Sequence, residues 1–276
     1  MDYNISKLII PAAGIGSRFL PITKSIPKEM LPLSNKPAIQ YIVQEGLDAK
    51  IDNILVVLSP EKSVIVDYFT RNQHLEDILA QQGKSSCLDE LNKLIAIAKF
   101  QYFIQNKPQG VANALLHAQP AIENDEFFAV ALPDDIIFGA KPEIGYLAKI
   151  AQEHQAMVIG VLEVPYDQIS SYGVVAPGLQ ITHDIFEIDH LVEKPQAADA
   201  PSNLAIVGRY IFHSSLFAHI PLTQPAANGE ILLPDTINLM IKKGFKVLAV
   251  KIKGQRFDTG TPQGWLEFIV KHNKID

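Results

Sequence analysis

An apolar run that ends in glycines constrains the fold of this chain more than any other feature of its sequence. Residues Lys7–Ala13 (KLIIPAA) have the character of a buried strand, and Gly14 and Gly16 follow directly. An amphipathic helical pattern then begins near Pro37, and a second apolar run, NILVVLS, occupies Asn53–Ser59. This strand–helix–strand order predicts a βαβ unit, and therefore a parallel pair of strands in one sheet.

Strand-like and helix-like segments alternate along the rest of the chain. The pattern predicts helices over most of 62–98, a strand at 101–105, and then 111–119 (helix), 127–132 (strand), 141–154 (helix) and 156–164 (strand). Strands at 173–176, 185–192 and 205–212 follow, and then 230–243 (helix), 247–252 (strand) and 262–273 (helix). In the run 185–192, strict alternation would place Phe186, Ile188, His190 and Val192 on one face. We expect a single α/β body with a Rossmann-like, mixed but mainly parallel sheet flanked by helices and a smaller β-rich part.

The charge and cysteine content exclude several classes of protein. The 276 residues carry a formal net charge of −6, which argues against nucleic-acid binding, since that depends on an excess of Lys and Arg. The one cysteine, Cys87, permits neither an intrachain disulfide nor a Cys-based metal site. No apolar run approaches the ~20 residues of a membrane helix, and no secretory signal begins the chain. We therefore expect a cytoplasmic protein without a membrane or nucleic-acid partner.

The loop after the first strand combines glycines with cations. Gly14 and Gly16 allow backbone N–H groups to approach phosphate oxygens, and Arg18, Lys24 and Lys28 supply positive charge. A dinucleotide fingerprint is absent because Phe19 stands where its third glycine belongs, and a Walker loop is absent as well. A tight turn with solvated charges is the alternative; the clustering of cations at a strand end favours phosphate binding.

Two aspartates follow apolar strands far apart in the sequence. Asp134 follows the run FFAVAL-Pro, and Asp258 lies between a predicted strand and the last helix. Either could simply cap a helix, but ligands of open α/β sheets bind beyond the carboxyl ends of the strands. Carboxylates are suitable ligands for Mg²⁺, so the pair predicts a magnesium site. We expect Asp135 to be a helix-capping or turn residue.

A second candidate pair, Glu193 and Lys194, precedes Pro195. Glutamate accepts hydrogen bonds from sugar hydroxyls and lysine neutralises a phosphate, but a solvated pair at a strand end is the favoured interpretation on chemistry alone. Strand alternation would even direct the two side chains to opposite faces. They could serve one site only if the chain bends at Pro195.

The segment Ala12–Tyr41 (AAGIGSRFLPITKSIPKEMLPLSNKPAIQY) resembles the signature of sugar-nucleotide pyrophosphorylases, and most of all their bacterial uridylyltransferase branch. The helical segment 70–98 also favours this branch. The resemblance implies a nucleotidyltransferase fold of the glycosyltransferase-A type in one domain, 1–276, with a nucleotide-binding part at about 1–140 and a sugar-phosphate part at about 141–276. It implies Mg²⁺ as cofactor.

The resemblance also assigns roles to the residues of the nucleotide side. Ala12, Ala13, Gly14 and Gly16 would hold the nucleotide, and Arg18 and Lys28 would hold its triphosphate and act in catalysis. Asp134 and Asp258 would hold the metal.

The sugar-phosphate site is implied by Tyr172-Gly173-Val174-Val175 and Glu193-Lys194-Pro195. In this family Lys194 would bind the phosphate and act in catalysis, while Gly173 and Glu193 would meet the sugar hydroxyls. Arg209 lies on a similar family strand, and its role, structural or functional, stays open.

The resemblance is weakest around the base-reading loop. Gln105 would read the uracil edge, because an amide offers both a donor and an acceptor, and Gly110 would belong to the same loop. The family's Gly and His are replaced by Ala112 and Asn113, and Leu232 stands where a glutamine is usual. A methyl group at position 112 is expected to narrow the nucleotide cleft.

The resemblance implies transfer of a uridylyl group from UTP to glucose 1-phosphate by a homodimer or homotetramer. Two alternatives remain. One is a nucleotidyltransferase with another base or sugar, such as a thymidylyltransferase. The other is a homologue that binds nucleotide sugars without catalysis, although such a protein would be expected to lose Lys28 or Asp134, and both are present.

Overall fold

The first four strands of the central sheet form the parallel arrangement that the sequence predicts. The structure, a computed structural model, describes residues 5–272. In it β1 (Lys7–Pro11) lies between β4 (Asn53–Leu58) and β6 (Phe127–Ala131), and β5 (Lys99–Ile104) lies beyond β4; all four are parallel. The expected α/β class with a mixed sheet is therefore confirmed.

The second half of the chain extends this sheet with strands of both directions. β11 (Leu204–His213) runs antiparallel between β6 and β8 (Met157–Glu163), and β12 (Val247–Lys251) is parallel to β8. β10 (Ile185–Glu193) and β9 (Gly173–Thr182) complete the sheet as antiparallel strands. The strand order is β5-β4-β1-β6-β11-β8-β12-β10-β9.

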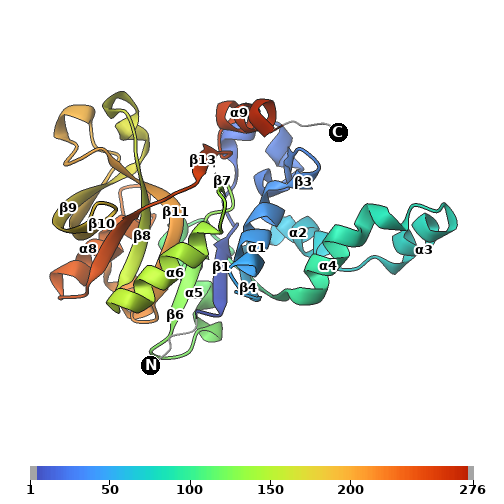
Figure 1. Ribbon diagram of the computed structural model, residues 1–276, viewed down its shortest axis with the longest axis horizontal. Coiled ribbons are helices and arrows are strands. Elements are labelled where there is room, and N and C mark those ends of the chain that lie inside the picture. The colour runs from blue at the N-terminus through green and yellow to red at the C-terminus, as the bar shows by residue number, and fades with distance from the viewer. Residues whose placement is uncertain (1–4, 273–276) are drawn as a thin grey trace.

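Helices cover both faces of the sheet because the strands alternate their apolar side chains (Figure 1). In β1, Leu8 and Ile10 belong to one core and Ile9 to the other. The first core is covered by α1 (Ala38–Asp48) and α6 (Glu143–His154). The second is covered by α5 (Gly110–Ala118), α7 (Leu216–His219) and α8 (Leu233–Lys242).

A two-stranded ribbon stands apart from the main sheet and was not predicted from the sequence. It pairs β7 (Asp135–Phe138) antiparallel with β13 (Gln255–Asp258), so that Asp135 lies opposite Asp258. α9 (Pro262–His272) packs on it, with the ring of Phe268 5.4 Å from those of Phe138 and Phe257. Asn273, the predicted last residue of this helix, lies outside the described residues. A short hairpin joins β2 (Pro32–Leu33) to β3 (Lys36–Pro37).

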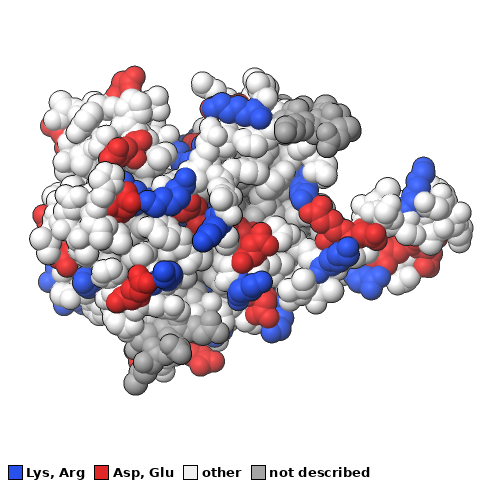
Figure 2. Space-filling view, in the orientation of Figure 1, with Lys and Arg blue, Asp and Glu red and all other residues white. Residues whose placement is uncertain are grey.

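The predicted helical segment between β4 and β5 forms an arm. It contains α2 (Ser63–Tyr68), α3 (Gln73–Gln81) and α4 (Asp89–Ile97), and α3 and most of α4 project away from the body (Figure 1). α3 buries none of its residues, and α4 buries only Leu94. On the face shown in Figure 2, acidic and basic side chains are interspersed over body and arm. No helix within residues 5–272 combines the length and apolarity needed to cross a membrane.

The predicted strict alternation in 185–192 is wrong. The pairing of β10 with β9 shifts register between Ile185 and Phe186, again before Ile188, and again before His190. These irregularities make Ile185, Ile188 and Leu191 the buried residues, while His190 is exposed. Bulges of this kind insert extra residues and rotate the following side chains, which a period of two cannot anticipate.

Candidate active site

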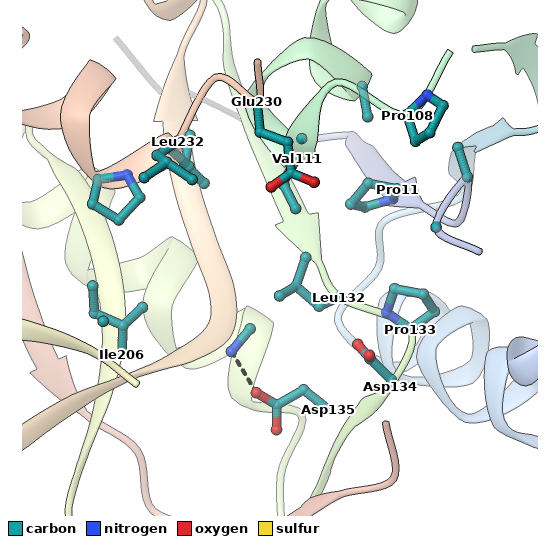
Figure 3. A pocket seen from close by; sticks show the side chains of 18 of the residues that line it. Pro11, Pro108, Val111, Leu132, Pro133, Asp134, Asp135, Ile206, Glu230 and Leu232 are labelled. Carbon is teal, nitrogen blue, oxygen red and sulfur yellow. Dashed lines mark hydrogen bonds between the residues drawn. The ribbon is translucent and has the colours of Figure 1, made fainter. Parts of the chain in front are cut away.

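A cleft of about 590 Å³ opens at the carboxyl ends of β1, β5 and β6. Because these strands are parallel, the loops that follow them meet at one edge of the sheet. The opposite wall comes from the start of β9, the end of β10 and the residues leading into α8; Figure 3 shows Glu230 and Leu232 of the last segment. The predicted site residues that line the cleft are Ala13, Gly14, Gly16, Lys28, Gln105, Gly110, Asp134, Gly173, Glu193 and Lys194. Ala12, Arg18 and Asp258 lie outside its lining.

The glycine loop is held in a conformation that requires glycine at one position. Gly16 has a φ of +74° and is followed by the 3-10 turn Ser17–Phe19. Thr23 donates a hydrogen bond from Oγ1 to the Gly16 carbonyl over 2.8 Å, and a Cβ on Gly16 would lie 3.1 Å from Thr23 Cγ2. The loop therefore closes on itself, and the exposed backbone of Gly14 is left facing the cleft.

The ammonium group of Lys62 holds this loop in place through hydrogen bonds, a role that was not predicted from the sequence. It lies in the 3-10 turn Pro60–Lys62 after β4 and is 6% exposed. Its ammonium donates to the carbonyls of Ala12 and Gly14, each over 2.6 Å, and to Glu29 Oε2 over 2.8 Å. Burial lowers the pKa of Lys62 and raises that of Glu29. The only available signal was position: Lys62 follows β4 at the same sheet edge as the glycine loop.

The predicted cation Lys28 and the predicted metal ligand Asp134 form an ion pair inside the cleft. Burial alone would lower the pKa of Lys28, but the neighbouring Asp134 carboxylate raises it above its ordinary value. Burial alone would raise the pKa of Asp134, but Lys28 lowers it, and Arg18 lowers it further. Arg18 is exposed, in the turn Ser17–Phe19, within electrostatic reach of this pair.

The β7–β13 ribbon brings Asp134 and Asp258 together. A Cβ added to Gly260 would lie 2.5 Å from Asp134 Oδ2 and 3.1 Å from Asp258 Oδ1, so both carboxylates crowd the same point and leave no room for a methyl group there. Burial, together with the negative charges of Asp134 and Asp135, raises the pKa of Asp258, although Arg256 opposes this.

The donor set fits a divalent cation that takes oxygen ligands. Two carboxylates converge on one point beside the glycine loop, and Mg²⁺ typically uses one or two carboxylates together with substrate phosphates and water. Among residues 5–272, no group of three or more His, Cys, Asp or Glu is placed to hold a metal. A magnesium ion here would therefore take the rest of its ligands from the substrate and from water.

Asp135 caps no helix, so that half of the expectation is wrong, but its backbone N–H does close a turn by donating to the Leu132 carbonyl over 3.3 Å. It begins β7, is 4% exposed, and accepts hydrogen bonds from the backbone N–H of Gly208 over 2.7 Å and from Arg256 Nε over 2.6 Å. Arg256 also donates to the hydroxyl of Tyr172 over 3.2 Å and lies over its ring. Asp135 thus ties β7 to β11 and anchors Arg256, which lines the cleft beside Tyr172.

Glu193 and Lys194 both reach the cleft because the chain bends one residue earlier than expected. β10 ends at Glu193, and Lys194 takes a φ of +47° rather than continuing the strand. Its backbone N–H donates to the Tyr172 carbonyl over 3.0 Å, and its ammonium lies 3.5 Å from Glu193 Oε1. The predicted bend at Pro195 is therefore wrong in position, although both residues line one cleft.

At the other end of the cleft Gln105 is held in place by its neighbours. It follows β5, is 4% exposed, and its backbone N–H donates to the Leu58 carbonyl over 2.8 Å. Its side-chain Nε2 donates to Asn113 Oδ1 over 2.8 Å. The expectation that Ala112 narrows the cleft is wrong, because its methyl group is fully buried in the core beneath α5 and absent from the cleft lining.

The backbone conformation and close packing at position 110 require glycine. Its φ is +89°, and a Cβ there would lie 2.7 Å from the carbonyl oxygen of Ile231. This close approach brings Glu230 and Leu232 to the cleft wall, where Glu230 points into the cavity beside Val111 (Figure 3). The segment that leads into α8 is thus packed directly against the loop that precedes α5.

The open question about Arg209 is answered by its burial. The side chain is fully buried, pairs with Glu45 through Nε and Nη2, and donates to the carbonyl of Gly208 over 3.0 Å. It is absent from the cleft lining. Arg209 therefore joins β11 to α1 and has a structural role.

Comparisons with known proteins show which family the chain resembles over nearly its whole length. The family model described as nucleotidyl transferase matches residues 7–274. A relative named UTP–glucose-1-phosphate uridylyltransferase, from Mycoplasma pneumoniae, is 41% identical over 266 residues, which are 96% of this chain and 91% of the relative.

Two similar solved structures have ligands bound. A UDP-glucose pyrophosphorylase complexed with UDP-glucose superimposes with a TM-score of 0.90 at 34% identity, covering 99% of this chain and 100% of its own. A UTP-bound UGPase from Acinetobacter baumannii superimposes with a TM-score of 0.90 at 33% identity, covering 99% of this chain and 96% of its own.

Proposed function

Because the chain belongs to the nucleotidyl transferase family, we propose that it transfers a uridylyl group from UTP to glucose 1-phosphate, giving UDP-glucose and pyrophosphate (EC 2.7.7.9). The observation that carries the proposal is the composition of one cleft. Its lining combines the glycine loop with Lys28, Asp134 and the Glu193–Lys194 pair, and Asp258 lies beside Asp134 outside that lining. The relatives that bind UTP or UDP-glucose have the same fold over nearly the whole chain.

The reaction is an in-line displacement at phosphorus. A phosphate oxygen of glucose 1-phosphate attacks the α-phosphorus of UTP, the bond from that phosphorus to the oxygen bridging to the β-phosphorus breaks, and pyrophosphate leaves with the bond's electron pair. A monoester phosphate has a second pKa near ~6 and is mostly a dianion at neutral pH. The nucleophile therefore needs no general base, and catalysis reduces to positioning and charge neutralisation.

The nucleotide is held at the glycine-loop end of the cleft. The backbone of Ala12, Ala13, Gly14 and Gly16 receives the nucleoside and its phosphates, and Gln105 with Gly110 receives the base. Lys28 and Arg18 neutralise the triphosphate. When UTP binds, Lys28 exchanges its contact with Asp134 for a phosphate oxygen, which frees the carboxylate for a metal ion.

The metal proposal assigns Mg²⁺ to Asp134 and Asp258. Bound there, the ion supplies positive charge to the phosphate oxygens of the nucleotide. The chain's own contribution is to fix the two carboxylates through the β7–β13 ribbon, with Thr259 Oγ1 donating to the carbonyl of Asp134 over 3.0 Å.

The sugar phosphate is held at the opposite end of the cleft. Lys194 binds the phosphate and aligns the nucleophile, and Glu193 accepts hydrogen bonds from glucose hydroxyls. Gly173 leaves room for the ring, since a Cβ there would lie 3.2 Å from Glu193 Oε2. The division into a nucleotide-binding part at about 1–140 and a sugar-phosphate part at about 141–276 follows from these assignments. A homodimer or homotetramer in the cytoplasm completes the proposal.

The test is release of pyrophosphate from UTP and glucose 1-phosphate by the purified chain, with Mg²⁺ and with excess EDTA. We expect activity that needs both substrates and is abolished by EDTA. Lys194→Ala should lower kcat by about 10²–10³-fold with an unchanged thermal midpoint, because Lys194 is exposed and its loss leaves no buried charge. Absence of pyrophosphate release by the folded wild type would overturn the function; full turnover by Lys194→Ala would remove that residue's role.

A further inference from the structure

We propose that Asn113 is a positioning residue that sets which way the Gln105 amide faces the nucleobase, and so sets the margin by which this enzyme prefers uracil over cytosine. The inference rests on the proposed function. It concerns a residue that never needs to touch the substrate and acts only through Gln105. Its starting observation is the side-chain hydrogen bond between the two amides.

Gln105 is fixed at both ends of its side chain. Its backbone follows β5 and donates to the Leu58 carbonyl over 2.8 Å, which holds the Cα at the sheet edge. The side chain is 4% exposed and lines the cleft, and its Nε2 donates to Asn113 Oδ1 over 2.8 Å. Asn113 itself stands in the first turn of α5, directly after the tight approach of Gly110 to Ile231. This hydrogen bond therefore couples the orientation of the Gln105 amide to that of the Asn113 amide.

The hydrogen bond to Asn113 leaves part of the Gln105 amide free to bind a nucleobase. The hydrogen bond to Asn113 uses one of the two hydrogens on Nε2, so the other hydrogen and Oε1 remain for a ligand. Uracil presents an N3–H donor beside carbonyl acceptors, whereas cytosine presents an N3 acceptor beside an amino donor. One amide orientation therefore matches uracil and the reversed orientation matches cytosine.

Asn113 imposes this choice only in part, because it is an amide too. If both side chains reversed together, Asn113 would donate through Nδ2 and Gln105 would accept through Oε1, and the pair would remain bonded. An aspartate at 113 could only accept, which would forbid the reversed pair. A leucine could neither accept nor donate, which would release Gln105 altogether.

The experiment measures kcat and KM of the Mg²⁺-loaded enzyme with UTP, CTP and dTTP at fixed glucose 1-phosphate. For Asn113→Leu we expect the KM for UTP to rise about fivefold and the UTP-to-CTP ratio of kcat/KM to fall by about the same factor. The KM for glucose 1-phosphate and the UTP-to-dTTP ratio should not change, since thymine presents the same N3–H edge as uracil. For Asn113→Asp we expect the UTP KM to be kept and the UTP-to-CTP ratio to rise.

A double-mutant cycle separates positioning from general damage to α5. With Gln105→Leu as background, Asn113→Leu should have no further effect on the UTP-to-CTP ratio, because the group that it positions is gone. Gln119→Leu, at the exposed position directly after α5, is the matched control and should leave every ratio unchanged.

The outcomes distinguish this inference from the proposed function. A wild-type enzyme that turns over UTP, together with an Asn113→Leu variant whose UTP-to-CTP ratio is unchanged, overturns the inference alone. An Asn113→Asp variant with a lowered ratio, or additive effects of the two leucine substitutions, overturns it as well. A wild type that releases no pyrophosphate from UTP overturns the proposed function instead.

Discussion

Lys62 shows how a single buried side chain determines the shape of the nucleotide loop. Its three hydrogen bonds reach two loop carbonyls and the carboxylate of Glu29, which itself lies between Lys28 and Met30. The second oxygen of that carboxylate, Oε1, is buried without a hydrogen-bond partner in the structure. Lys62 therefore supplies the positive charge that offsets the cost of burying the Glu29 carboxylate. The same ammonium group also holds the loop carbonyls in place.

Replacement of Lys62 tests this interpretation. Lys62→Met should lower the free energy of unfolding by about 3–5 kcal/mol, because Glu29 is left buried and unpaired. The double variant Lys62→Met/Glu29→Gln should regain part of that loss. It should still show a raised KM for UTP and an unchanged KM for glucose 1-phosphate, because the carbonyls of Ala12 and Gly14 remain without their donor. Urea unfolding and steady-state kinetics are the measurements.

A UTP KM restored to the wild-type value in the double variant would contradict the positioning role and leave only a structural one. Lys50→Met, a lysine exposed on the surface, serves as the control and should change neither quantity.

The site residues differ in how far the sequence could identify them. Gly14, Lys28 and Asp134 could be predicted to lie at one cleft, because they follow strands whose carboxyl ends meet at one sheet edge, whereas Lys194 was assigned only through the family resemblance. Lys62 could not, since its sequence neighbours Glu61 and Ser63 suggest a solvated surface turn. The cleft that it helps to form depends on contacts between residues about fifty positions apart, and periodicity carries no such information.

At the scale of elements, the start of α6 is held in place by a buried carboxyl group that accepts backbone hydrogen bonds. Glu143 begins this helix, is 3% exposed, and its Oε1 accepts from the N–H groups of Lys253 and Gly254. Its Oε2 has no hydrogen-bond partner in the described structure. Burial raises the pKa of Glu143, although the two backbone donors oppose the rise. The helix start is thereby fastened to the chain that leads into β13.

The raised pKa of Glu143 determines whether its contribution to stability grows or shrinks with pH. A carboxyl group whose pKa is raised by folding stabilises the native state at low pH, and the contribution is lost as pH rises from the unfolded pKa through the folded one. Glu143→Gln keeps one acceptor for the backbone and removes the buried charge. We expect it to be more stable than the wild type at pH 8, by roughly 1 kcal/mol or less, with the difference shrinking as pH falls toward 4.

Thermal unfolding of both proteins between pH 4 and pH 8 measures this difference. A gap between the two midpoints that widens on acidification would contradict the assigned direction. Glu153→Gln, on the exposed side of the same helix, should show no comparable trend.

Most elements could be predicted from periodicity, but two irregular features could not. The β7–β13 ribbon consists of two four-residue strands that pair across more than a hundred positions, and segments this short carry little pattern of their own. The register shifts in β10 depend on its pairing with β9, which the sequence of one strand does not encode. Both features bear on the site, since one carries Asp258 and the other ends at Glu193.

At the scale of the whole molecule, the arm is separable from the catalytic body. The stretch from Asn72 to Leu88 contributes no buried residue, whereas Phe69 before it and Leu94 after it belong to the core. The arm therefore contributes little to the stability of the body. The cleft lies at the far end of β1 and its neighbours and takes no lining residue from the arm.

Replacement of residues 72–88 by a flexible Gly-Ser linker tests this separation. We expect kcat and both KM values to stay within about twofold, and the thermal midpoint to fall by no more than about 3 °C, because almost no apolar surface is lost from the core. Light scattering of the same protein reports whether the arm joins subunits. A large loss of activity in a shortened chain that is still folded would contradict the separation.

The aromatic packing of α9 on the β7–β13 ribbon has a consequence for the order in which the enzyme folds during synthesis. Asp134 is made near the middle of translation, but its acidic counterpart arrives about 120 residues later, and the strand that carries it is clamped by Phe268 only when the final helix docks. A nascent chain thus completes its nucleotide loop early and its acidic pair last. A variant that lacks α9 should therefore hold Asp258 less firmly and turn over UTP more slowly than the whole chain.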